Sequence, residues 1–170
     1  MATSRRGLLG ILSLATAGLG ARAAQGAPAP LDMEALKKDA DVGCLYHCDF
    51  GDPQRFSQML QNINNHYSAY DFDPLKVKLV VVAHAAGIKF FLNDLAGTPW
   101  EKDTIDPEIY KRFVGLTKYG LEAYLCQITY KRLNIDPAKT KADASLRFVP
   151  SGVATVAELQ GKGFAYLKVG

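Results

Sequence analysis

The chain has 170 residues, of which 48% are hydrophobic and 22% charged, with a formal net charge of +3. This composition is typical of one globular domain and argues against a disordered chain. The positive charge belongs to the N-terminal segment: removing residues 1–23 removes Arg5, Arg6 and Arg22 and no acidic residue, which leaves a net charge of zero. The remaining 147 residues (170 minus 23) give no electrostatic reason to expect a nucleic-acid partner.

The first 23 residues have the features of an export signal. The pair Arg5 and Arg6 precedes a mildly apolar run over residues 8–19, which is too short to span a membrane. Small residues at Ala21 and Ala23 suit cleavage by a signal peptidase. We predict a twin-arginine signal peptide over residues 1–23 and a periplasmic protein with no membrane contact after cleavage. An ordinary secretory signal and an uncleaved N-terminal anchor are the alternatives.

After a predicted linker over residues 24–41, strands and helices alternate. Asp52 and Pro53 provide an N-cap and a first helical position, and Gly120 ends a later helix. The run KVKLVVV is the most strand-like in the chain. The expected order is strand 42–48, helix 53–67, strand 76–82, short helix 88–93, helix 106–119, strand 121–126, helix 127–133, strand 146–149, helix 153–160 and strand 164–169.

This alternation predicts one α/β domain over residues 42–170, with a parallel sheet covered on both faces. In such sheets, functional groups gather beyond the carboxyl ends of the strands. Those ends carry Cys48, His84, Cys126 and the turn containing Ser151. We therefore expect these residues, which are far apart in the sequence, to lie along one edge of the domain.

Cys126 is the main candidate for chemistry. It ends a short apolar strand and directly precedes a polar, basic helix. The N–H groups at the start of a helix favour thiolate over thiol, and Lys131 and Arg132 add positive charge nearby. We therefore predict a nucleophilic sulfur at Cys126, with Gln127 beside it at the helix start. The alternative is an inert buried cysteine that only fills space.

The other candidates have both functional and structural interpretations. His84 either donates a hydrogen bond to a sulfur anion or is a structural histidine. Cys48 is a partner for Cys126 only if their strand ends are neighbours, which the sequence does not decide. His47 is expected to be structural, and His66 to be solvated on a helix surface.

Several known motifs are absent from the sequence. It contains no glycine-rich phosphate loop, no G-x-S-x-G turn and no C-x-x-C pair, so we expect neither nucleotide binding nor a hydrolase nor a thioredoxin-type dithiol. A disulfide between Cys44 and Cys48 is not expected, because four residues of strand span about 13 Å. No second cluster of Cys and His follows at zinc-finger spacing. We therefore predict no cofactor and no metal ion.

Three segments resemble the DsrE/DsrF-like family of sulfur-relay proteins: VKLVVVAHAAG, GLEAYLCQITYKRLNI and FVPSGVATVAELQGKGFAYLKV. The last is similar to exported members in particular, and Ala85 stands where the family often has a second glycine. The resemblance implies a three-layer α/β/α domain with a five-stranded, largely parallel sheet, assembled as a homo-oligomer, commonly a trimer or hexamer. It also implies that Cys126 carries sulfur as a persulfide and passes it to a partner.

These observations support three hypotheses about function. In the first, the protein is an exported sulfur carrier rather than a turnover enzyme, and Cys126 exchanges sulfane sulfur with a thiol or persulfide partner protein. His84, Gln127, Cys48 and Ser151 are its supporting residues. In the second, the protein is a periplasmic module that binds a small molecule or takes part in assembly, and Cys126 is structural. In the third, Cys48 and Cys126 form a redox pair.

Overall fold

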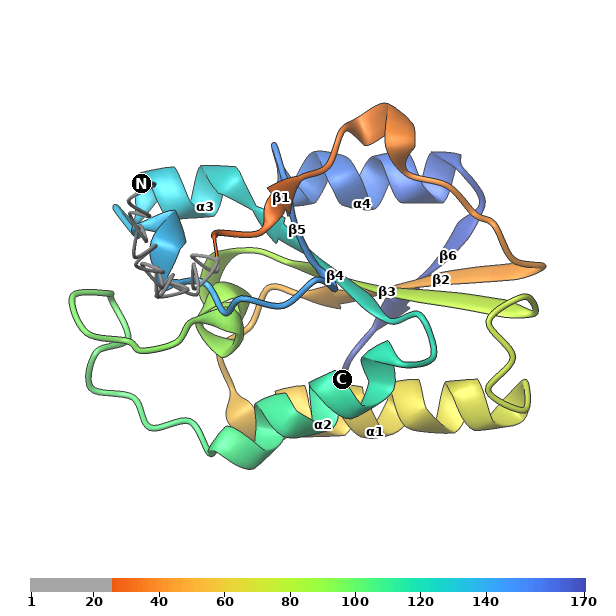
Figure 1. Cartoon of the computed structure of the whole chain (residues 1–170), viewed down its shortest axis with the longest axis horizontal. Coiled ribbons are helices and arrows are strands. Elements are labelled where there is room, and N and C mark those ends of the chain that lie inside the picture. The colour runs from red at the N-terminus through yellow and green to blue at the C-terminus, as the bar shows by residue number, and fades with distance from the viewer. Residues whose placement is uncertain (1–25) are drawn as a thin grey trace, which may run out of the picture.

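A sheet of six parallel strands runs through the centre of the computed structural model, which describes residues 26–170 (Figure 1). The strands are β1 (Ala29–Pro30), β2 (Val42–Cys48), β3 (Val77–Ala83), β4 (Glu122–Cys126), β5 (Leu146–Val149) and β6 (Phe164–Lys168). Their order across the sheet is β1-β5-β4-β3-β2-β6, and every neighbouring pair is parallel. The carboxyl ends of the central strands therefore meet at one edge.

Helices cover both faces of this sheet. The α-helices are α1 (Pro53–Ala69), α2 (Pro107–Thr117), α3 (Gln127–Arg132) and α4 (Gly152–Gly161), and the 3-10 helices are η1 (Met33–Ala35), η2 (Ala85–Phe91) and η3 (Pro137–Lys139). Figure 1 shows α1 and α2 on one face of the sheet and α4 on the other. We call these the α1 face and the α4 face. No helix among the described residues is long and apolar enough to cross a membrane.

Aspartate caps begin the two long helices of the α1 face, and the cap at Asp52 is the one predicted above. The Asp52 side chain accepts a hydrogen bond from the Arg55 N–H at 2.6 Å, and the Asp106 side chain accepts one from the Glu108 N–H at 2.9 Å. A proline follows each aspartate at the start of the helix. Each cap satisfies an N–H group that has no partner within the helix.

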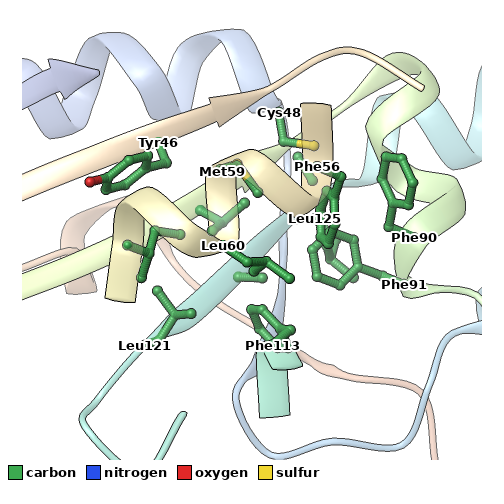
Figure 2. Close-up of a cluster of buried hydrophobic side chains, with 14 of the residues drawn as sticks. Tyr46, Cys48, Phe56, Met59, Leu60, Phe90, Phe91, Phe113, Leu121 and Leu125 are labelled. Atoms are coloured by element: carbon green, nitrogen blue, oxygen red, sulfur yellow. The ribbon is translucent and has the colours of Figure 1, made fainter. Parts of the chain in front are cut away.

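Each strand sends alternate side chains to opposite faces, which produces two hydrophobic clusters. On the α1 face, Phe56, Met59 and Leu60 of α1 pack against Tyr46 and Cys48 of β2 (Figure 2). On the α4 face, a smaller cluster contains Leu36, Leu45, Val80, Val82, Tyr124, Val149, Leu159 and Phe164. Burying one such side chain contributes about 1.5–3 kcal/mol, so the two clusters fix which residues each strand turns toward α4.

The predicted parallel α/β fold is confirmed, with six strands in place of five. The extra strand lies in the segment predicted as a linker over residues 24–41. Ala29 and Pro30 pair with the edge of β5, and the Leu31 N–H donates to the Phe148 carbonyl at 2.7 Å. Leu36 is buried, so the described part of that segment packs against the domain. A two-residue strand containing proline suits the edge of a sheet, where a missing N–H costs little. The predicted signal peptide, residues 1–23, lies outside the described residues.

Ala85 allows a direct test of backbone strain at the end of β3. Its φ of 48° lies in the left-handed region, where an alanine costs about 1 kcal/mol more than a glycine. We expect Ala85→Gly to raise the free energy of unfolding in urea by about 1 kcal/mol. The control is Ala86→Gly, the next residue of η2, which has no positive φ and should gain nothing. Equal stability of the two variants would contradict this.

Candidate functional site

At the carboxyl ends of β2, β3 and β4, three side chains face α4: those of His47, His84 and Cys126. Register pairs Cys48 with Ala83 and Ala83 with Leu125, so these three strands end level with one another. Leu45, Val82 and Tyr124 belong to the cluster on the α4 face. Because side chains alternate, His47, His84 and Cys126, each two residues further along its strand, face the same side.

Gly152, the first residue of α4, lies against two of these side chains. A β carbon at this position would be 2.9 Å from Cβ of His84 and 3.1 Å from Cβ of Cys126. His84 and Cys126 are therefore neighbours that pack against the same point of backbone. The preceding residue, Ser151, is the N-cap of α4, and its hydroxyl accepts a hydrogen bond from the Ala154 N–H at 3.3 Å. The structure brings together three of the predicted site residues, His84, Cys126 and Ser151.

These three residues line an open cavity of about 700 Å³. Its other walls are largely apolar and include Trp100, Ile128 and Val153, and Arg132 adds a positive charge. Cys126 is only 5% exposed, while Ile128 and Val153 are 45% and 67% exposed at the rim. The sulfur atom therefore lies in the wall of an apolar cavity that is open to the outside.

An ion pair between a buried lysine and an exposed aspartate holds the loop that completes this cavity. Lys89 of η2 is 5% exposed, and its Nζ lies 2.5 Å from Oδ2 of Asp103. Asp103 belongs to the loop that carries Pro99 and Trp100 into the cavity wall. Two other lining residues are joined by a hydrogen bond: the Ala85 N–H donates to Oγ1 of Thr129 at 3.0 Å, which ties the segment after β3 to α3. Because Lys89 is buried, loss of Asp103 would leave its charge without a partner, and this ion pair and the Thr129 hydrogen bond both help to fix the shape of the cavity.

A chain of hydrogen-bonding side chains continues from His84 away from the cavity. Nε2 of His84 lies 2.6 Å from Nε2 of His47, and Nδ1 of His47 lies 2.9 Å from the Tyr166 hydroxyl. Burial lowers the pKa of both histidines, and the neighbouring His47 lowers the pKa of His84 further. The Asp49 carboxylate partly opposes these shifts, and Arg55 adds to that of His47. The pair is therefore favoured in its neutral form.

The sequence interpretation missed the roles of two histidines. The sequence predicts a structural His47, but its ring contacts His84. The one hint in the sequence is position: His47 is the last residue but one of its strand and lies on the same side as Leu45. His66 was expected to be solvated, and that prediction is wrong. It is half-buried, with Nδ1 3.0 Å from the Tyr46 hydroxyl, and burial lowers its pKa. Tyr166 gave no signal at all.

Two predicted site residues lie away from the cavity. Cys48 is fully buried on the α1 face (Figure 2), and burial raises the pKa of its thiol. Strand β3 separates it from Cys126, and two strand spacings of about 4.8 Å exceed the reach of a disulfide. The condition for a partnership of Cys48 and Cys126, that their strands be neighbours, is therefore not met. Gln127 lines a separate hollow of about 460 Å³ with Tyr130 and Phe148.

All three cysteines, Cys44, Cys48 and Cys126, are free thiols. Within residues 26–170, no group of three or more His, Cys, Asp or Glu side chains is arranged to hold a metal ion.

Comparison with protein families matches residues 44–169 to the model of the DsrE/DsrF-like family. The chain belongs to the DsrE/DsrF-like family. This family is associated with sulfur relay, and the match includes His47, His84, Cys126, Ser151 and Tyr166.

Among solved structures, the chain is similar to a protein of unknown function from Methanobacterium thermoautotrophicum. The two share 22% sequence identity with a TM-score of 0.61, over 75% of this chain and 99% of that chain. At this identity the likeness shows a shared fold alone. None of the curated proteins compared matches the chain.

The close approach of Gly152 predicts a large effect for a single methyl group. We expect Gly152→Ala to lower the free energy of unfolding by about 1–3 kcal/mol, because the new β carbon overlaps His84 and Cys126. Gly161 in the same helix has nothing within 4 Å of its β position. Gly161→Ala should therefore leave stability unchanged or raise it by up to about 1 kcal/mol. Urea denaturation of both variants measures the difference, and equal effects would show that the approach is not tight.

Proposed function

We propose that the protein is an exported sulfur carrier, in which Cys126 holds sulfane sulfur as a persulfide and transfers it to a partner thiol. The observation that carries the proposal is the position of Cys126, beside His84 in the wall of an open cavity, in a chain of the DsrE/DsrF-like family. A sulfur carrier needs a thiolate that a donor and an acceptor can reach in turn. It needs no cofactor and no metal ion.

The transfer is a pair of thiol exchanges that balance without an external oxidant. The Cys126 thiolate attacks the outer sulfur of a donor persulfide, forming the Cys126 persulfide while the donor's S–S bond breaks. The donor leaves as a thiolate and takes up one proton. An acceptor thiolate then attacks the outer sulfur on Cys126, and the Cys126 thiolate is released. His84 is the side chain placed to accept the Cys126 proton and to protonate a leaving thiolate.

The cavity suits this chemistry in its size and its lining. A volume of about 700 Å³ accommodates a small donor molecule or a peptide segment that carries a cysteine. The apolar walls around Trp100 and Ile128 suit a polarisable sulfur chain. Arg132 provides a positive charge that attracts an anionic polysulfide or persulfide.

The second candidate function is a periplasmic module that binds a small molecule or takes part in assembly, and in which Cys126 is structural. The 5% exposure of Cys126 is the observation that favours it, because a thiol this covered also fills space well. Alkylation of the folded protein separates the two functions: a carrier cysteine reacts with iodoacetamide, and a packed one resists it. A redox pair of Cys48 and Cys126 is not proposed, because β3 lies between their strands.

Export and assembly are part of the proposal. The paired arginines and the cleavage motif of residues 1–23 support transport by the twin-arginine route to the periplasm. The exposed apolar residues Ile128 and Val153 support an interface between copies at the cavity rim, in a trimer or hexamer. The partner would be a thiol or persulfide protein of the same compartment, with no role for nucleic acid or membrane.

The central prediction concerns a single sulfur atom. After treatment with polysulfide, the parent protein should gain the mass of sulfur on Cys126, and Cys126→Ser should lose this gain. Cys44→Ser is the matched control, because Cys44 is also 5% exposed but lies on the α1 face, away from the cavity. Intact-mass spectrometry with peptide mapping measures both. Undiminished uptake by Cys126→Ser would refute the proposal.

Expression of the full chain tests export and assembly in one preparation. We expect the protein in the periplasmic fraction, with an intact mass that corresponds to cleavage after Ala23. Native mass spectrometry of that material should show three or six copies. Full-length protein retained in the cytoplasm would contradict export, and a single copy at micromolar concentration would contradict assembly.

A further inference from the structure

A continuous row of polar side chains crosses three adjacent strands on the α4 face. Tyr166 is on the edge strand β6 and is 40% exposed, His47 is on β2, and His84 follows β3. The ring centroids of Tyr166 and His47 are 5.6 Å apart, and those of His47 and His84 are 4.8 Å apart. The row therefore begins at solvent on β6 and ends at the cavity that Cys126 lines.

We propose that Tyr166, His47 and His84 form a proton relay between solvent at the β6 edge and the cavity. The inference rests on the proposed function for its use, because it supplies protons to the sulfur chemistry of Cys126. His84 is the group at the cavity. His47 and Tyr166 act through it as positioning residues.

The geometry requires one shared proton at each contact. Two Nε2 atoms 2.6 Å apart attract each other only when one carries hydrogen and the other offers a lone pair. Nδ1 of His47 meets the Tyr166 hydroxyl at 2.9 Å, so both nitrogens of this ring are occupied. Nδ1 of His84 has no hydrogen-bond partner among residues 26–170, and His84 lines the cavity. One nitrogen at the end of the chain is therefore free to meet a ligand.

Two arrangements of the protons satisfy all of these contacts. In the first, the Tyr166 hydroxyl donates to Nδ1 of His47, Nε2–H of His47 donates to Nε2 of His84, and Nδ1 of His84 carries hydrogen. In the second, Nε2–H of His84 donates to Nε2 of His47, Nδ1–H of His47 donates to the Tyr166 oxygen, and Nδ1 of His84 is bare. Both rings are neutral in both arrangements.

Switching between these arrangements moves one proton along the whole chain. When Nδ1–H of His84 protonates a leaving thiolate, His84 takes a proton from His47, His47 takes one from Tyr166, and solvent restores the hydroxyl. When bare Nδ1 of His84 takes the Cys126 proton, the same transfers run backwards and a proton leaves to solvent at Tyr166. Protonation of a leaving thiolate therefore leaves the chain in the arrangement that accepts the Cys126 proton, and acceptance of that proton restores the first arrangement. No electron is transferred.

The surroundings favour a relay over a stored charge. Burial lowers the pKa of both imidazoles, and two charged rings at 2.6 Å would repel each other. Two charged groups act on the chain from outside. The Asp49 carboxylate raises the pKa of both histidines, and the Arg55 guanidinium lowers the pKa of His47. Arg132 lies on the cavity side. Protons therefore pass through the pair without a long-lived imidazolium.

The test uses ¹⁵N NMR of labelled histidines in the mature protein and its Tyr166→Phe variant. Tyr166 does not touch His84, so a relay predicts that loss of one hydroxyl changes the ¹⁵N shifts of His84 as well as those of His47. The matched control is Tyr46→Phe, which removes the hydroxyl 3.0 Å from Nδ1 of His66 on the opposite face of β2. That variant should change His66 and leave His84 unchanged. Unchanged His84 shifts in Tyr166→Phe would overturn the relay.

A second readout measures sulfur transfer from the Cys126 persulfide to a small thiol across pH. We expect Tyr166→Phe to slow transfer by about tenfold, with Tyr46→Phe at the parent rate, since positioned proton transfer contributes about 10²–10⁴ in rate. If Tyr166→Phe transfers sulfur at the rate of the parent protein and with the same pH profile, the relay is also overturned. The NMR coupling is measured in Cys126→Ser too, so it survives if the sulfur function alone is wrong. If sulfur transfer persists but Tyr166→Phe leaves the ¹⁵N shifts of His84 unchanged, the sulfur-carrier function stands and the relay is refuted.

Discussion

The level ending of three parallel strands is the constraint on which the site depends. Because β2, β3 and β4 stop in register, and because side chains alternate, one residue from each strand reaches the same side of the same edge. The α4 helix then closes on them through Gly152, which has no side chain to hold them apart. A shift of one residue in any of these strands would turn its His47, His84 or Cys126 side chain toward the opposite hydrophobic cluster.

Much of this arrangement is predictable from the sequence, because it depends on local signals. The apolar runs and the aspartate-proline caps predict the strands, the helices and their order. The rule that strand ends gather at one edge predicts that His84 and Cys126 lie together. The choice of Cys48 fails for a physical reason: it is the last residue of its strand, but the residue before it is the one that faces α4. Only one of two consecutive strand residues can point each way.

The remaining part of the site depends on strand order, which local signals do not contain. Tyr166 meets His47 because β6, the last strand of the chain, pairs with β2. Trp100 reaches the cavity through a loop anchored by the ion pair between buried Lys89 and exposed Asp103. The short strand at Ala29 and Pro30 is likewise defined by its neighbour β5. In each case the sequence provides the residue, but a distant element decides its place.

In the sulfur carrier proposed above, the near-complete cover of Cys126 would make the empty thiol and the loaded persulfide differ in access. A disulfide-type S–S bond is about 2.05 Å long, so a persulfide places its terminal atom beyond the position of the bare thiol. The empty sulfur is 5% exposed, so donors and oxidants alike reach it only through the cavity that Cys126 lines. Because Cys126 lines the cavity, the proposed persulfide would bring its terminal atom nearer to the open space. In the proposed carrier, cover at this depth would leave the loaded sulfur easier for an acceptor to reach than the empty thiol.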